Sequence, residues 1–187
     1  LIEQFVRRFP RRGKISNAPQ AQAGVKYHDL TQIKDESARF RRCAPAGTFA
    51  EDFATAPSPG IVATTLQNAF YDSHEAYLDA LARELRHEYM AIHEAGLILQ
   101  IDAPDLAMER TMMFQDLSDS DFLSMCDLHL HAINKAVDSI PRDRWRLHVC
   151  WGNWEGPHEH DVPLGAILPI LYRTTAGALS IEFANPR

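Results

Sequence analysis

Short apolar runs that alternate with long amphipathic helical patterns are the feature that most constrains how this chain can fold. One apolar run covers residues 97–101, a second covers residues 145–150 and a third covers residues 178–183. Apolar residues recur at helical spacing in residues 73–95, before the first run, and in residues 119–138, between the first and the second. Apolar strands separated by helices are typical of a parallel sheet covered by helices. The sequence therefore predicts an α/β protein built from right-handed βαβ units.

Weaker patterns complete the expected order of elements. Asp72 or Ser73 can cap the first helix, and Gly96 can end it. Residues 57–60, with two prolines and a glycine, predict a turn after a strand, and loops at such positions often carry binding groups, here Ser58. The remaining expectations are a short strand at residues 25–27 and a short helix at residues 164–173.

Composition limits the classes of function that this chain can have. The 187 residues, with 45% hydrophobic content, are enough for one sizeable core, so a single domain over residues 1–187 is expected. A net charge of −6 argues against nucleic acid or an anionic membrane as the main partner. No apolar run approaches the roughly 20 residues of a membrane span, and a signal peptide is not recognisable, which favours the cytoplasm. The abrupt start and end of the chain predict an incomplete copy of a larger domain.

Polar residues mark the ends of the three predicted strands. His148 and Cys150 are two residues apart on one strand, so their side chains point the same way and can bind one ion together. An imidazole and a thiolate are a ligand pair that suits zinc. The three cysteines have no disulfide spacing, which favours reduced thiols or metal binding. Asp102 ends the first buried strand, and Glu182 is a carboxylate in an apolar strand. Burying a carboxylate costs free energy unless it is paired or binds a metal.

Each of these residues also has a simpler interpretation. His148 and Cys150 form a short motif, and Glu182 can instead pair with an arginine. Trp151 or Trp154 can stack on a flat substrate, but a tryptophan beside a strand end is often core. The loop histidines His158 and His160, with Asp161, form a rival cluster for metal or substrate. Cys126 is expected to pack in the core, and His129 and His131 diverge on their helix, which makes them poor joint ligands.

Several ordered motifs together resemble the catalytic barrel of cobalamin-independent methionine synthase, and more closely the shorter bacterial proteins grouped with that family. The likeness covers roughly residues 45 to 187 and rests on Pro57-Ser58-Pro59, Leu97 with Gln100-Ile101-Asp102-Ala103-Pro104, His148-Val149-Cys150, and Ile181-Glu182-Phe183-Ala184-Asn185. The resemblance implies a zinc-dependent TIM (β/α)₈ barrel, incomplete in this chain. It also implies a methyltransferase that moves a methyl group from 5-methyltetrahydrofolate to the thiol of homocysteine, a reaction of methionine biosynthesis.

The resemblance also assigns roles to individual residues. It implies that His148, Cys150 and Glu182 bind Zn²⁺ and that Asp102 is the catalytic residue that holds the amino group of the substrate. Ser58, Trp151 and His158 are the further candidates for contacts with the homocysteine-like thiol or the folate-like methyl donor.

Three departures from the family pattern place the substrate in more doubt than the fold. The family's fourth zinc ligand is a later cysteine, and none follows Cys150; Ala103 stands where the methionine synthases carry an acidic residue; and the interval from Cys150 to Glu182 is longer. The alternatives are alkyl transfer to or from another, coenzyme-M-like thiol, a metal-free lyase resembling uroporphyrinogen decarboxylase, and a non-catalytic barrel.

Overall fold

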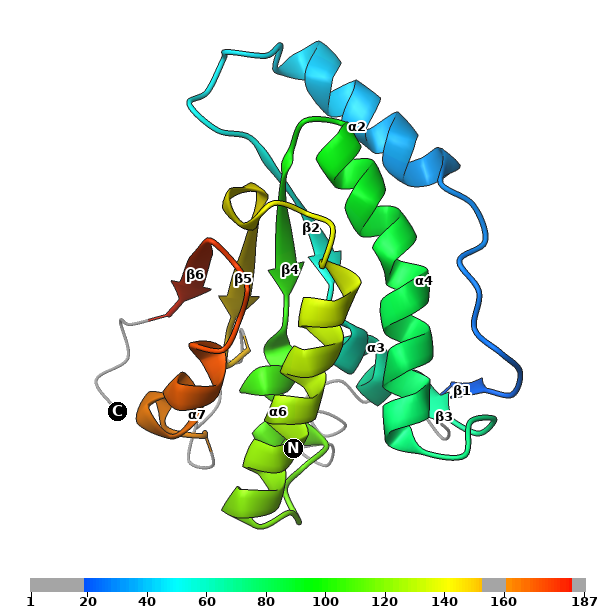
Figure 1. Cartoon of the computed structure of the whole chain (residues 1–187), viewed down its shortest axis with the longest axis vertical. Helices are drawn as coiled ribbons and strands as arrows, with labels where there is room; N and C mark the ends of the chain where they lie inside the picture. Colours follow the sequence, from blue (N-terminus) through cyan, green and yellow to red (C-terminus); the bar gives the residue numbers. More distant parts are fainter. Residues whose placement is uncertain (1–18, 153–160, 183–187) are drawn as a thin grey trace, which may run out of the picture.

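A four-stranded parallel sheet forms the centre of the molecule. The computed structural model describes residues 19–152 and 161–182 (Figure 1). The strands lie in the order β2, β4, β5, β6, and the chain is therefore a mixed α/β protein with a parallel sheet that is not closed into a barrel within these residues. The strands of this sheet are β2 (Phe53–Pro57), β4 (Ile98–Asp102), β5 (Trp145–Val149) and β6 (Ala178–Ile181).

Helices connect the strands and pack against one another on one side of the sheet. Figure 1 shows α4, α6 and α7 along one face, and α2 lies beside the carboxyl-terminal end of α4, where Arg41 donates to the carbonyl oxygen of Gly96 at 3.2 Å. The helices are α2 (Thr31–Cys43), α3 (Pro59–Thr65), α4 (His74–Glu94), α5 (Glu109–Met112), α6 (Asp119–Ala136) and α7 (Leu164–Leu171), with 3₁₀ turns η1 (Pro104–Leu106) and η2 (Arg142–Arg144). A separate short parallel pair joins β1 (Gln20–Ala21) to β3 (Gln67–Asn68).

Serine side chains cap the amino-terminal ends of the two long helices, and the first of these caps was expected from the sequence. The Ser73 hydroxyl accepts a hydrogen bond from the backbone N–H of Ala76 at 3.0 Å, which makes Ser73 and not Asp72 the cap of α4. After α4, Gly96 adopts a positive φ of 77°, a conformation that glycine tolerates best. Ser118 caps α6 in the same way as Ser73 caps α4.

The two faces of the sheet differ in chemistry. Leu99 and Leu147 are fully buried, and their strand neighbours that point the same way belong to the hydrophobic core beneath the helices. Because side chains alternate along a strand, the residues between them point to the opposite face. That face carries polar side chains in register, with Gln100 beside Arg146 on one level and Asp102 beside His148 on the next.

The structure confirms most of the expected elements and corrects three expectations. Residues 25–27 are not a strand, and the poorly patterned early segment contains the helix α2. Residues 57–60 are more than a turn, because the Ser58 hydroxyl caps α3 and Pro59 begins that helix. Glu182 is not a buried carboxylate within a strand, because β6 ends at Ile181 and Glu182 is exposed.

None of the helices in the described parts of the chain is both long enough and apolar enough to cross a bilayer.

Candidate functional site

Asp102 and His148 form a direct contact at the carboxyl ends of two adjacent parallel strands. The two residues are register partners of β4 and β5, and Nδ1 of His148 lies 2.9 Å from Oδ1 of Asp102. The Gln100 side-chain amide donates a second hydrogen bond to the same carboxylate oxygen at 2.8 Å. A carboxylate at Nδ1 favours the tautomer with its proton on that nitrogen, which directs the lone pair of Nε2 away from Asp102.

Cys150 and Glu182 each stand one residue beyond the end of a strand, next to this pair. Burial raises the pKa of the half-buried Cys150 thiol, and the negative charges of Glu182 and Asp102 raise it further. A backbone hydrogen bond from Gly152 acts in the opposite direction. The thiol is therefore held in its protonated form at neutral pH, and a cation that bound there would have to displace this proton.

The predicted zinc ligands do not form a finished metal site. Throughout residues 19–152 and 161–182, no three histidine, cysteine, aspartate or glutamate side chains are grouped so that they could hold a metal ion. The donor types of His148, Cys150 and Glu182 suit zinc, but their arrangement does not meet this requirement.

The other predicted substrate contacts have different surroundings. The Ser58 side chain is completely buried, and its hydroxyl donates to Oδ1 of Asp105 while it accepts from the backbone N–H of Ile61. The Trp151 indole donates to the carbonyl oxygen of Val162 at 2.8 Å, and its ring packs on the core. His158 lies outside the described residues, as do Trp154 and His160.

A buried polar network lies behind the strand ends. Asp105 and His129 are both 0% exposed, and Nδ1 of His129 lies 2.8 Å from Oδ2 of Asp105. Asp105 receives the Ser58 hydroxyl on its other oxygen. On the far side of the His129 ring, its Nε2 lies 3.0 Å from Nε2 of His74. Ser58, Asp105, His129 and His74 thus form one continuous chain, which we call the buried network.

Glu109 lies beside the buried network without a full set of partners. It is 4% exposed, and its Oε2 atom has no hydrogen-bond partner. Burial and, next, the negative charge of Asp105 raise the pKa of Glu109 from 4.5 to about 7, against the smaller lowering by His129. Near neutral pH, the Glu109 carboxyl is therefore close to half-protonated.

A Glu109→Gln substitution should change how stability depends on pH. The native pKa lies above the ordinary value, so native Glu109 holds its proton more tightly than the unfolded chain does. The contribution of Glu109 to the free energy of unfolding is complete below pH 4.5 and falls as the pH rises to about 7. Relative to wild type, the variant should gain about 2–3 kcal/mol of unfolding free energy between about pH 4.5 and pH 8, measured by urea denaturation at each pH.

Glu94→Gln, at the exposed end of α4, is the matched control and should leave the pH profile of unfolding unchanged. A Glu109→Gln profile parallel to wild type over the whole range would show that the native site does not penalise the Glu109 anion.

The buried network was not predicted from the sequence. Its best local signal is the pair of carboxylates Asp102 and Asp105 on either side of Pro104, directly after a buried strand. A second signal is the position of His129 next to Leu130 on the apolar stripe of α6 that also contains Cys126. Cys126 is 1% exposed, which confirms that it packs in the core.

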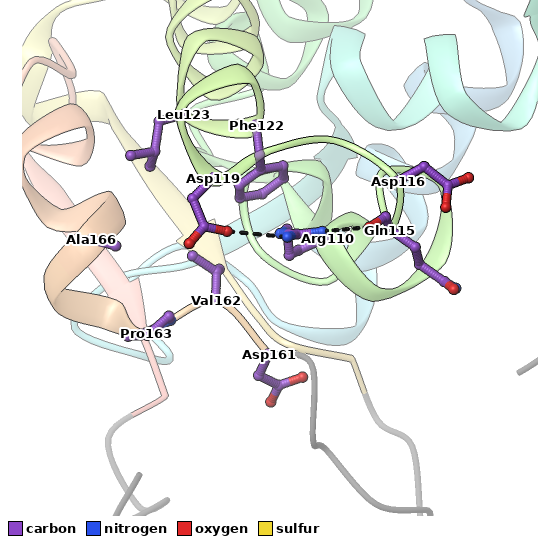
Figure 2. Close-up of a pocket in the computed structure, with 10 residues that line it drawn as sticks. All are labelled: Arg110, Gln115, Asp116, Asp119, Phe122, Leu123, Asp161, Val162, Pro163 and Ala166. Carbon is purple, nitrogen blue, oxygen red and sulfur yellow. Dashed lines mark hydrogen bonds and ion pairs between the residues drawn. The ribbon is translucent and has the colours of Figure 1, made fainter.

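A cavity of about 450 Å³ lies apart from the strand-end residues (Figure 2). Arg110 occupies its centre, where it donates to Asp119 at 3.1 Å and to the carbonyl oxygen of Phe114 at 2.8 Å. Its lining is Arg110, Gln115, Asp116, Asp119, Phe122, Leu123, Asp161, Val162, Pro163 and Ala166. Asp161, from the rival loop cluster, belongs to this lining, whereas Asp102, His148, Cys150 and Glu182 do not.

Comparison with known proteins adds no relative, since no protein-family model and no curated protein matches this chain.

Proposed function

We propose that this chain is a transferase that moves a methyl or related alkyl group from a folate-like donor to the thiol of a homocysteine-like acceptor. The observation that carries the proposal is the contact between Asp102 and His148 at the carboxyl ends of β4 and β5, with Cys150 and Glu182 immediately beyond their strands. In parallel α/β enzymes, catalytic residues collect at this edge from different strands. The proposal includes a (β/α)₈ barrel of which the four strands are one part.

Asp102 and His148 have distinct parts in the proposed reaction. The carboxylate of Asp102 can hold the ammonium group of an amino-acid thiol by a charge-assisted hydrogen bond. The same carboxylate fixes the His148 ring through Nδ1, which leaves Nε2 for the substrate or for a cation. In the transfer, the acceptor thiol loses its proton and its sulfur forms a bond to the methyl carbon, while the bond from that carbon to the donor nitrogen breaks. The electron pair of the broken bond stays on the donor nitrogen, which takes up a proton.

Zinc is the proposed cofactor, with His148, Cys150 and Glu182 as its protein ligands. When bound, it would keep the acceptor thiol in its reactive thiolate form. His148 suits ligation because histidines that bind metals usually donate their other ring N–H to a carboxylate or carbonyl, as His148 does to Asp102.

A metal-free barrel related to decarboxylases, or a non-catalytic one, is the second candidate. The observation that favours it is that the described residues contain no group of three possible metal donors.

Zinc titration against a chelating dye separates the two candidates. The proposal predicts that the chain binds zinc and that Cys150→Ser weakens binding by about tenfold or more, because thiolate is the strongest of the three donors. Cys43→Ser is the control, since Cys43 is exposed at the end of α2, and it should bind zinc like wild type. A wild-type chain that takes up no zinc, or equal uptake by Cys150→Ser, would favour the metal-free candidate.

Asp102→Asn tests the substrate role when zinc binding and homocysteine binding are both measured. It should bind nearly as much zinc as wild type but bind homocysteine about tenfold more weakly, because the amide lacks the charge that attracts the ammonium group. Loss of zinc in this variant would instead make Asp102 a positioning residue for His148.

A further inference from the structure

Arg146 is a fixed cation on the polar face of the sheet. It lies two residues before His148 in β5 and points to the same face, because Trp145 and Leu147, on either side of it, point into the core. Its Nε donates to Oε1 of Gln100 at 2.7 Å, and its Cζ lies 4.0 Å from the centre of the Phe53 ring. A hydrogen bond at one edge and a ring beneath one face hold the guanidinium in one orientation.

No carboxylate in the described residues neutralises this guanidinium. Several arginines in the described residues have an acidic partner within ion-pair distance, as Arg110 has Asp119 and Arg173 has Asp127. Arg146 makes no such pair, and its two terminal nitrogens donate to no atom within residues 19–152 and 161–182. A half-buried cation without a counter-ion is unfavourable, and a planar guanidinium binds oxyanions with two parallel hydrogen bonds.

Gln100 keeps this cation apart from the acidic end of the site. Its amide oxygen accepts from Arg146, while its amide nitrogen donates to Asp102 at 2.8 Å. The polar face therefore carries the positive charge of Arg146 at one level of the sheet. Asp102 and His148 lie together at the next level, two residues further along the strands. The two levels are about 7 Å apart, because a strand rises about 3.3 Å per residue.

We propose that Arg146, supported by Gln100 and Phe53, is an anion-binding subsite that takes the carboxylate or sulfonate of a small thiol. About two or three carbons between the sulfur and the anion allow the anion to reach Arg146 while the sulfur lies at the level of His148. The inference that the ligand carries a thiol rests on the proposed function, whereas the inference that it carries an anion rests on the surroundings of Arg146 alone.

Ligand-observed NMR titration of the whole chain tests the subsite with four probes. They are 3-mercaptopropionate, 2-mercaptoethanesulfonate, neutral 2-mercaptoethanol, and propionate, which has no thiol. Wild type should bind both anionic thiols about tenfold more tightly than 2-mercaptoethanol, since a charge-assisted bidentate contact has that effect. The two anionic thiols distinguish a carboxylate from a sulfonate ligand.

Arg146→Met should remove the preference for anionic thiols and weaken propionate binding. Arg83→Met is the matched control, because Arg83 is an exposed arginine on α4, and it should keep the wild-type preference. Arg146→Lys, which retains a charge but not the planar fork, should keep only part of the preference, and it provides a second test if Arg146→Met does not fold. Equal binding of anionic and neutral thiols by wild type, or an unchanged preference in both Arg146 variants, would overturn the subsite.

The propionate titration separates this proposal from the proposed function. If the chain binds propionate through Arg146 but shows no preference for thiols and no methyl transfer, the anion subsite stands and the thiol transferase fails. If His148→Ala removes the thiol contribution while the preference for anions remains, both proposals are supported.

Discussion

Asp105→Ala should destabilise the protein by about 3–5 kcal/mol, because it leaves two fully buried hydrogen-bonding groups without their partner. The substitution would leave the Ser58 hydroxyl and Nδ1 of His129 without their acceptor, in a place that water does not reach. Domains of this size are stable by only about 5–15 kcal/mol, so the loss is a large part of the total. Urea denaturation followed by circular dichroism measures it.

Two further variants make the result specific to the buried network. Asp79→Ala removes an ion pair with Lys135 in which both side chains are about half exposed, and it should lose less than about 1 kcal/mol. Asp105→Asn should lose less than Asp105→Ala, since the amide can still accept from Ser58 and can donate to Nδ1 of His129 once that ring changes tautomer. A loss for Asp105→Ala no larger than that for Asp79→Ala would mean that the network contributes little to stability.

Gly60→Ala should destabilise the protein by about 3 kcal/mol or more, because a side chain at this position has no space. An added Cβ would overlap Oδ2 of Asp105 and Nδ1 of His129, the two atoms that form the central hydrogen bond of the buried network. Neither atom belongs to a flexible chain end that can move away, because both residues are fully buried. The variant must therefore break that hydrogen bond or displace α3.

Gly165→Ala is the matched control for this experiment. Gly165 lies in α7, and an added Cβ would meet no atom within 4 Å. Alanine favours a helix over glycine by about 1 kcal/mol, so this variant should be as stable as wild type or slightly more so. Thermal unfolding of the two variants side by side gives the comparison. A Gly60→Ala variant as stable as Gly165→Ala would show that the buried network can rearrange around an added side chain at little cost in stability.

Local patterns in the sequence were sufficient to predict the main elements of the fold. Helical periodicity located α4 and α6 to within a few residues, capping residues located the ends of α4, and apolar runs located β4 and β5. These predictions succeeded because periodicity and capping depend on neighbours within one or two turns. The same patterns could not decide whether the sheet closes, since closure depends on the edge strands, and the described strands form an open sheet.

The predicted site was located only in part by the same reasoning. His148 lies on the polar face of the sheet, and the parallel register brings it to Asp102. Glu182 differs from the expectation because β6 ends at Ile181, and the carboxylate beyond the strand is exposed to water, so it needs no buried partner.

The sequence by itself determined a parallel α/β architecture and the polar residues at its strand ends, because both follow from short-range periodicity. Only the tertiary structure decided which polar side chains become partners. Asp105 meets His129 across 24 positions of sequence, and Ser58 meets Asp105 across 47, through the packing of α3, η1 and α6. That packing makes the Ser58 hydroxyl a buried structural group, whereas Arg146, on the opposite face of the sheet, has no acidic partner in the described residues. Pairings of this kind depend on how distant elements dock, and no local pattern records them.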